Sequence, residues 1–90
     1  MTKGMVVAPQ PEAAETGLDI LGDGGNVVDA AVAASLVQTA VDPQMCGIAG
    51  FGSMHLYLAD RGVHTCIDFH GRAPLATKPE MWEGIIDREC

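Results

Sequence analysis

Four side chains between positions 55 and 68 could hold a metal ion, because imidazole, thiolate and carboxylate groups are all ligands that zinc accepts. This stretch alternates apolar and polar residues, which predicts a β-hairpin that pairs Leu58 with Val63. In that register one face of the hairpin carries His55, His64, Cys66 and Asp68. The alternative, which we favour, is that this face packs on a neighbouring layer. No spacing among the four residues is diagnostic of a metal site.

Two further features have both a chemical and a structural interpretation. The glycine-spaced run Gly47–Gly52 could bind an anion through its backbone N–H groups, although it lacks the Gly-Lys-Ser/Thr ending of a phosphate loop. We favour the alternative that it lets helix and sheet backbones approach closely. Asp29, one turn into an apolar helix, could be a buried polar anchor near an active site. Its position favours a cap for the preceding Gly24–Asn26 turn.

The elements that must position these residues follow from the hydrophobic pattern. Met5–Ala8 is a short apolar run closed by prolines, which predicts a buried strand. A helix is expected from about Pro11 to Leu21, because proline suits the first helical turn. Gly22 would end this helix as a left-handed cap. Gly25 lies where the chain must reverse, so we expect a left-handed conformation there as well.

A second helix follows directly. Asn26 is a favourable N-cap, and Asp29 three residues later resembles the second member of a capping box. The apolar run Val27–Val41 then continues the helix, and Glu80–Ile86 could add a helical turn after the hairpin. The order strand, two helices and β-hairpin predicts an α+β fold, with two helices packed on a sheet edge.

The Val27–Val41 helix is apolar on almost every side, and such a helix must be buried on every side. Ninety residues cannot easily supply that much cover, although 48% of them are hydrophobic. We therefore expect residues 1–90 to form an incomplete domain, as a piece of something larger or as a subunit that needs a partner.

The charge balance excludes two classes of partner. Twelve Asp and Glu residues oppose five Lys and Arg residues, so the formal net charge is -7. No basic stripe is present to neutralise phosphates, which argues against binding to nucleic acid or to anionic membranes. The Val27–Val41 stretch is also too short to span a bilayer.

Cysteine usage and the amino terminus bear on the compartment. Cys46, Cys66 and Cys90 are an odd number without CxxC spacing, which fits a reducing compartment better than a disulfide framework. The first residues lack the apolar core and cleavage site of a signal peptide. These features predict a cytoplasmic protein, or a periplasmic or secreted one if a leader was removed.

Nearly the whole chain resembles the gamma-glutamyltransferase (gamma-glutamyl transpeptidase) family of N-terminal nucleophile hydrolases. The most specific signature is Gly24-Gly25-Asn26 followed two residues later by Asp29-Ala30-Ala31. The other matching segments are Gly4–Ala8, Gly17–Leu21, Pro43, the Gly47–Gly52 glycines, Ile67-Asp68-Phe69 and Ala73-Pro74.

The resemblance implies the amino-terminal segment of the family's large subunit, within an αββα sandwich that is made as a longer precursor and cuts itself. Its nucleophile would be the new amino-terminal Thr of the small subunit, acting with its own α-amine as base. The implied partners are the rest of the large subunit, the small subunit and a gamma-glutamyl or related amide substrate, with no cofactor or metal. No threonine of this chain lies in the nucleophile context: Thr2, Thr16, Thr39, Thr65 and Thr77. We therefore expect the chain to be inactive alone.

The resemblance also implies one substrate-binding position. Many members carry Arg-Glu before the Ala-Pro step, where the Arg binds the substrate α-carboxylate through bidentate pairing. Here His70 and Gly71 occupy those positions, and Arg72 follows. A neutral imidazole cannot make a two-pronged ion pair. Arg72 could bind the carboxylate instead, or it could make a structural salt bridge, so a substrate other than a glutamyl amide is compatible with the sequence.

Three classes of function remain open from the sequence. The first is an enzyme segment, the front of a gamma-glutamyltransferase-like amidohydrolase or acyltransferase. The second is a small metal-binding protein that uses the hairpin face. The third is a non-catalytic interaction module that assembles through its apolar second helix.

Overall fold

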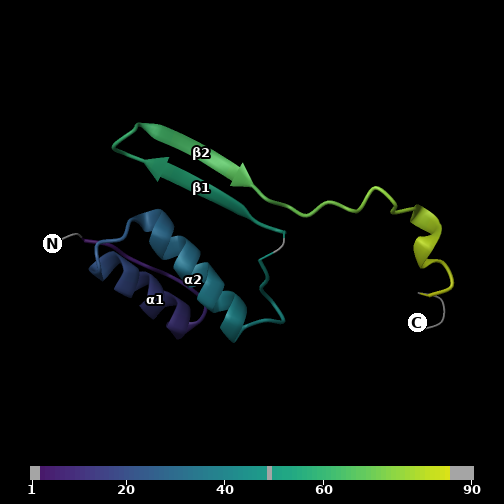
Figure 1. Cartoon of the computed structure of the whole chain (residues 1–90), viewed down its shortest axis with the longest axis horizontal. Coiled ribbons are helices and arrows are strands. Elements are labelled where there is room, and N and C mark those ends of the chain that lie inside the picture. The colour runs from purple at the N-terminus through teal and green to yellow at the C-terminus, as the bar shows by residue number, and fades with distance from the viewer. Residues whose placement is uncertain (1–2, 49, 86–90) are drawn as a thin grey trace. The chain divides into compact units, whose positions relative to one another are not determined.

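The structure is a computed structural model that describes residues 3–48 and 50–85. The chain divides into two compact units, Met1–Ala49 and Gly50–Cys90. The first unit holds the helices α1 (Pro11–Gly22) and α2 (Val27–Val41), and the second holds the strands β1 (Ser53–Leu58) and β2 (Val63–Asp68) (Figure 1). The predicted α+β class is confirmed. The larger αββα sandwich stays a prediction from resemblance.

The two helices of the first unit pack on each other through small residues. Ala13 and Gly17 of α1 are buried, as are Ala30 and Ala34 of α2. A Cβ on Gly17 would lie 2.8 Å from Cγ1 of Val6 and 3.5 Å from the carbonyl oxygen of Ala30. Glycine at this position therefore allows the extended amino-terminal segment and the second helix to approach α1 closely.

The turn between the helices differs from the prediction in its glycines. Gly22 is the last residue of α1, and the left-handed conformation occurs at Gly24, with φ of 93°. Gly25 is not left-handed, but a Cβ there would lie 2.8 Å from the carbonyl oxygen of Ile20. The backbone N–H of Gly25 donates to that same oxygen at 2.8 Å. Glycine is therefore required at position 25 because a Cβ would have no room there, and not because of its φ angle.

The predicted capping of α2 is confirmed. The Asn26 side chain accepts hydrogen bonds from the backbone N–H groups of Val28 and Asp29, both at 2.9 Å. The Asp29 carboxylate in turn accepts the backbone N–H of Asn26 at 3.1 Å. This reciprocal capping box makes Asp29 part of the helix start, as the structural interpretation predicts.

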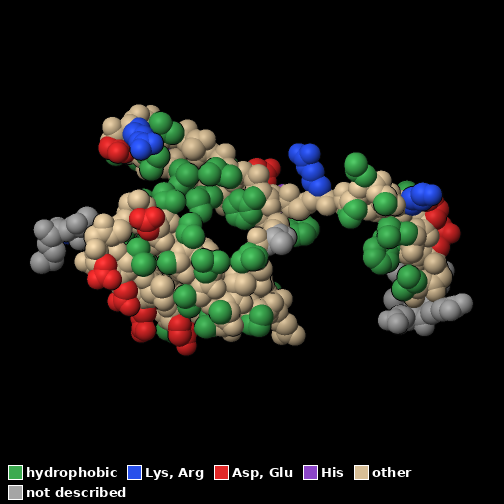
Figure 2. Space-filling view, viewed as in Figure 1, with side chains coloured by type: hydrophobic (Ala, Val, Ile, Leu, Met, Phe, Trp, Pro, Cys, Tyr) green, Lys and Arg blue, Asp and Glu red, His purple; other side chains and the backbone are tan. Residues whose placement is uncertain are grey.

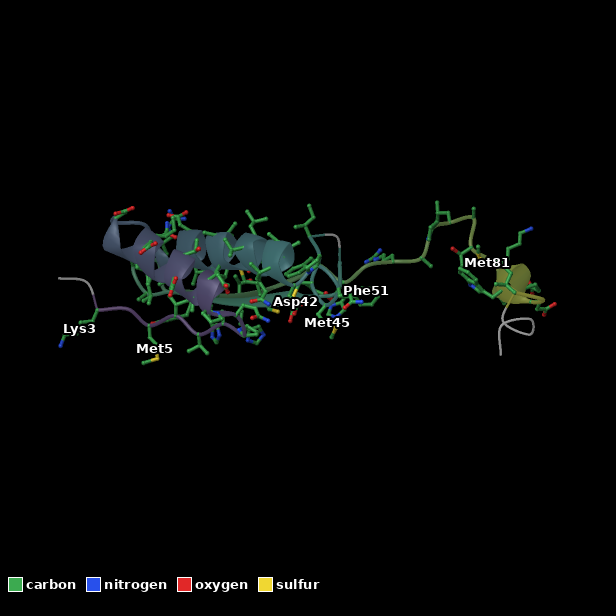
Figure 3. The ribbon with its side chains drawn as sticks, turned by 90° about the horizontal axis from the view of Figure 1, so that it is seen from below. Lys3, Met5, Asp42, Met45, Phe51 and Met81 are labelled. Atoms are coloured by element: carbon green, nitrogen blue, oxygen red, sulfur yellow. The ribbon has the colours of Figure 1, made fainter. Side chains whose placement is uncertain are left out.

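The predicted strand over Met5–Ala8 is wrong: these residues lie in neither a helix nor a strand. The sheet that the structure describes has two strands, β1 and β2, and no backbone ladder pairs this segment. An apolar run becomes a strand only when its backbone groups find a ladder partner. Met5 is 87% exposed and projects away from the ribbon (Figure 3).

The α2 helix is less buried than its apolar sequence predicts. Val27 is 62% exposed and Leu36 is 55% exposed. The hydroxyls of Ser35 and Thr39 donate to the carbonyl oxygens four residues earlier, at 2.7 and 3.0 Å. These two hydroxyls are therefore satisfied within the helix, beside its exposed apolar side chains.

The β-hairpin of the second unit has the predicted register. β1 and β2 are antiparallel, with Leu58 opposite Val63 and His55 opposite Cys66. The turn that joins them carries a left-handed Gly62, with φ of 60°. The predicted carboxyl-terminal helical turn is a short 3-10 helix, η1 (Pro79–Trp82), and Ile86 lies outside the described residues.

Neither helix of the described segments combines the length and the apolar character that a membrane crossing requires. Figure 2 shows acidic side chains along the edge formed by α1 and hydrophobic side chains on the surface of both units.

Candidate functional site

The candidate site lies at the open end of the hairpin, where the chain enters β1 and leaves β2. Gly50 has φ of 102°, and a Cβ there would lie 3.1 Å from both the Cα and the N of Gly71. A Cβ on Gly52 would collide with the ring of Phe69, and the carbonyl oxygen of Gly52 accepts the N–H of Phe69 at 3.0 Å. The two backbones can approach here because the entering segment has no Cβ at these points.

This geometry changes the interpretation of the Gly47–Gly52 run. Gly50 and Gly52 allow close approach to Gly71 and Phe69 at the base of the hairpin. A Cβ on Gly47 would meet no described atom within 4 Å. The approach of helix and sheet backbones stays a prediction.

Phe51, between those glycines, holds a conformation that a bulky residue rarely adopts. Its φ is 61°, in the left-handed region, where a Cβ costs about 1–2 kcal/mol. Its ring meets that of His70 edge-on, with centroids 6.1 Å apart and an interplanar angle of 78°. Phe51 lies where the chain enters the hairpin (Figure 3). Strained residues of this kind cluster at functional sites.

Asp68 and His70 form a compact hydrogen-bonded pair. Oδ1 of Asp68 accepts the backbone N–H of His70 at 3.0 Å and lies 2.7 Å from Nδ1 of its imidazole. The backbone N–H of His70, and secondarily its ring, holds the pKa of the Asp68 carboxyl below its ordinary value. Both side chains are exposed, 57% for His70 and 74% for Asp68. The imidazole is thus held at one nitrogen, and the other nitrogen is left for solvent or a ligand.

Arg72 has different surroundings although it lies only two residues further along. It is exposed, and within the described ranges the one contact between a basic and an acidic side chain is that of Asp68 with His70. The alternative of a structural salt bridge for Arg72 therefore has no support in this part of the chain. The structure thus holds His70 in a pair with Asp68, whereas the Arg72 guanidinium has no acidic partner among the described residues.

The hairpin face that could have supplied metal ligands has no metal-binding cluster among the described residues. His55 lies directly opposite Cys66, and the rings of His55 and His64 are 6.4 Å apart, so these residues do share a face. Nevertheless, no group of three His, Cys, Asp or Glu side chains in the described residues is arranged to hold a metal ion. Tyr57 occupies the position opposite His64 and contacts its ring edge-on, with centroids 6.0 Å apart.

The sequence predicts His70 and Arg72 as site residues. It does not predict a place in this site for Asp68 or Phe51. Asp68 was assigned to the metal-ligand face, whereas its carboxylate binds His70. Phe51 was not selected at all. Its signal is the Gly50-Phe51-Gly52 pattern, which marks a backbone where one bulky side chain is placed between two positions that exclude a Cβ.

Comparison with known proteins identifies one family. Residues 13–89 match the sequence profile described as Gamma-glutamyltranspeptidase. The chain is 44% identical over 86 residues to "Acylase ACY 1 proenzyme" of Pseudomonas sp. (strain SE83), covering 96% of this chain. It is 42% identical over 79 residues to "Glutathione hydrolase proenzyme" of Bacillus subtilis (strain 168), covering 88% of this chain.

A solved structure shows the same fold. Gamma-glutamyltranspeptidase from Pseudomonas nitroreducens, complexed with L-DON, superimposes with a TM-score of 0.80 at 35% identity, over 91% of this chain and 24% of that one. The chain spans 15% of the length of the acylase proenzyme and 14% of the glutathione hydrolase proenzyme.

Proposed function

Because the chain belongs to the gamma-glutamyltranspeptidase family, we propose that it is the amino-terminal segment of the large subunit of an amidohydrolase or acyltransferase made as a proenzyme. The observation that carries this proposal is the match over residues 13–89 together with the shared fold. The names of the relatives support a proenzyme, and they also indicate that family members act on different amides.

The proposed reaction splits the amide in two steps. A nucleophilic amino-terminal Thr, outside these 90 residues, attacks the substrate carbonyl while its own α-amine accepts the hydroxyl proton. The protonated α-amine gives its proton to the substrate nitrogen, which leaves as the free amine when the amide bond breaks. Water or an acceptor amine then loses a proton to the α-amine and attacks the acyl-enzyme, which breaks the ester bond and regenerates the Thr hydroxyl. This chain would supply substrate contacts, and its partners would be the rest of the large subunit and the small subunit. The absence of a cofactor requirement and a cytoplasmic location stay predictions from the sequence.

The proposed substrate contact of this segment is Arg72. Its guanidinium is exposed and unpaired within the described ranges, and its planar fork suits a carboxylate. His70 cannot replace it, because its Nδ1 faces the Asp68 carboxylate, which would repel a second anion. We therefore propose an amide substrate that carries a carboxylate, of which a gamma-glutamyl amide is one.

The test uses the complete protein that contains this segment. Purified protein should separate into two chains, and amino-terminal sequencing of the smaller one should begin at Thr. It should hydrolyse gamma-glutamyl p-nitroanilide or an acylated amine, and replacing that Thr by Ala should abolish both cleavage and hydrolysis. An uncleaved and inactive wild-type protein would reject the proposal.

A further inference from the structure

We propose that Asp68 fixes His70 as a hydrogen-bond acceptor, so that this site recognises an N–H or ammonium donor on the substrate, next to the carboxylate bound by Arg72. This inference rests on the proposed function, because it assigns a substrate group to a residue of the same site. It makes His70 a specificity-determining residue, with Asp68 and Phe51 as its positioning residues.

The first step is the tautomer of His70. The Asp68 carboxylate is ionised near neutral pH and carries no proton. It can therefore only accept the two hydrogen bonds that it makes with His70. Nδ1 of His70, 2.7 Å away, must therefore be the protonated nitrogen. In a neutral imidazole the other nitrogen, Nε2, then has a free lone pair and can only accept a hydrogen bond.

The second step is the orientation of the ring. The imidazole is bonded to Asp68 at Nδ1, and the edge-on contact with Phe51 restricts it further. The backbone hydrogen bond from His70 to the same carboxylate oxygen fixes the main chain at this point. The side chain is still 57% exposed, so the pair is preorganised without being closed off from a ligand.

The third step is the distribution of charge. The Asp68–His70 pair carries one negative charge when the imidazole is neutral, whereas Arg72 carries one positive charge. A second carboxylate would be repelled near His70, whereas an ammonium would gain both the Nε2 hydrogen bond and the attraction of Asp68. The segment is thus complementary to a ligand that bears a carboxylate and a nitrogen donor.

The experiment compares three p-nitroanilides on the complete processed protein. The gamma-glutamyl compound has both an ammonium and a carboxylate, the glutaryl compound lacks the ammonium, and the 4-aminobutanoyl compound lacks the carboxylate. We expect His70→Ala to lower the kcat/KM of the gamma-glutamyl compound about 10-fold and to leave that of the glutaryl compound within about 2-fold. Asp68→Ala should also lower the kcat/KM of the gamma-glutamyl compound, because without the Asp68 carboxylate neither ring nitrogen of His70 is fixed as the protonated one.

Two controls separate positioning from folding. Asp68→Asn keeps an oxygen that can accept both hydrogen bonds but removes the charge, so it should retain part of the preference for the ammonium. His64→Ala removes an exposed histidine that does not contact Asp68, and it should leave the ratio of the two kcat/KM values unchanged. In addition, ¹⁵N spectra of histidine-labelled protein should show Nδ1 protonated at His70 in the wild type, but a tautomer mixture in Asp68→Ala.

The outcomes distinguish this inference from the proposed function. A wild-type protein that is neither cleaved nor active on any of the three anilides rejects the proposed function. An active wild type in which His70→Ala and Asp68→Ala lower both kcat/KM values equally overturns the inference and leaves the proposed function standing. Finding His70 protonated at Nε2 rather than Nδ1 in the neutral ring would also overturn it.

Discussion

His70 and Arg72 lie two positions apart in one exposed segment, yet their surroundings give them different chemistry. The imidazole is held by the Asp68 carboxylate and by the edge of Phe51. The guanidinium has no ionic partner among residues 3–48 and 50–85. If the two residues bind the substrate as proposed, recognition of its carboxylate and of its nitrogen donor should be separable by mutation.

The proposed contact of Arg72 with a substrate carboxylate gives the first prediction. Arg72→Ala should lower kcat/KM for gamma-glutamyl p-nitroanilide roughly 10–150-fold, because one charge-assisted contact contributes about 1.5–3 kcal/mol. Arg72→Lys should recover only part of this loss, since an ammonium lacks the planar fork. Steady-state kinetics of the complete protein measure the effect.

The matched control for Arg72 is the 4-aminobutanoyl compound, which lacks the carboxylate. Its kcat/KM should change little in Arg72→Ala. Equal losses on both compounds would show that Arg72 is structural.

The Asp68 carboxyl gives a prediction about pH. Its pKa is lower in the folded chain than in an unfolded one, so the ionised carboxylate favours the folded hairpin base. That stabilisation is fully present above about pH 4 and is lost as the pH falls through the lowered pKa. The carboxyl ¹³C shift of Asp68 in a labelled sample, followed during acid titration, measures the pKa directly.

Two variants at position 70 separate the causes of this shift. His70→Ala removes the ring but keeps the backbone N–H, which is the larger cause, so the pKa of Asp68 should rise only in part. His70→Pro removes both donors, so the pKa should return to its ordinary value. If both variants gave the same pKa, the backbone hydrogen bond would have no role in the shift.

At the scale of elements, the turn between α1 and α2 contains three glycines, of which Gly24 and Gly25 are needed for different reasons and Gly22 is not needed for space or for its φ angle. Gly22 ends α1 and has open space around it, whereas Gly24 adopts a left-handed φ in open space. Gly25 has no room for a Cβ beside the carbonyl oxygen of Ile20. The capping box of Asn26 and Asp29 then begins α2 directly after this turn.

Alanine substitution should distinguish these three positions in the complete protein. Gly22→Ala should be neutral or raise the free energy of unfolding by up to about 1 kcal/mol, because alanine is the better helix former. Gly24→Ala should lower it by about 1–2 kcal/mol through its φ angle. Gly25→Ala should lower it by about 1–3 kcal/mol, because a backbone oxygen must move.

Urea unfolding of the three variants provides the comparison, with Gly22→Ala as the matched control. A neutral Gly25→Ala would contradict the steric role of this glycine. Equal losses for Gly22→Ala and Gly24→Ala would contradict the difference in their φ angles.

At the scale of the whole molecule, little of the described chain is buried. The buried hydrophobic residues are Ala13, Ala30 and Ala34, all of them small. Large apolar side chains remain exposed on both units, among them Phe51 at 84% and Met45 at 82%. Hydrophobic burial is the main favourable term in folding. The described residues bury little apolar surface, so this term stabilises them only weakly.

We therefore predict that the isolated chain does not behave as a stable monomer. Each large apolar side chain left exposed forgoes about 1.5–3 kcal/mol of burial. Thermal unfolding followed by circular dichroism should lack a cooperative transition, and sedimentation should show self-association. The complete protein is the control and should unfold cooperatively. A compact monomer with a sharp transition for the 90-residue chain would contradict this prediction.

Features that depend on contacts between near neighbours could be predicted from the sequence. The capping box of Asn26 and Asp29 forms from groups three residues apart, and the alternation over 53–68 sets the hairpin register. The helices over 11–22 and 27–41 follow from the same local patterns. These predictions succeeded because each stabilising contact lies within a few residues or across one tight turn.

The tertiary structure alone decided what depends on distant segments. Met5–Ala8 has the composition of a strand but no ladder partner among the described residues, and an apolar α2 helix is compatible with both burial and exposure. The left-handed Phe51 reaches His70 only because Gly50 and Gly52 let two backbones meet across the hairpin base. Strand pairing and side-chain environment depend on contacts between segments far apart in the chain, which local hydrophobic patterns do not specify.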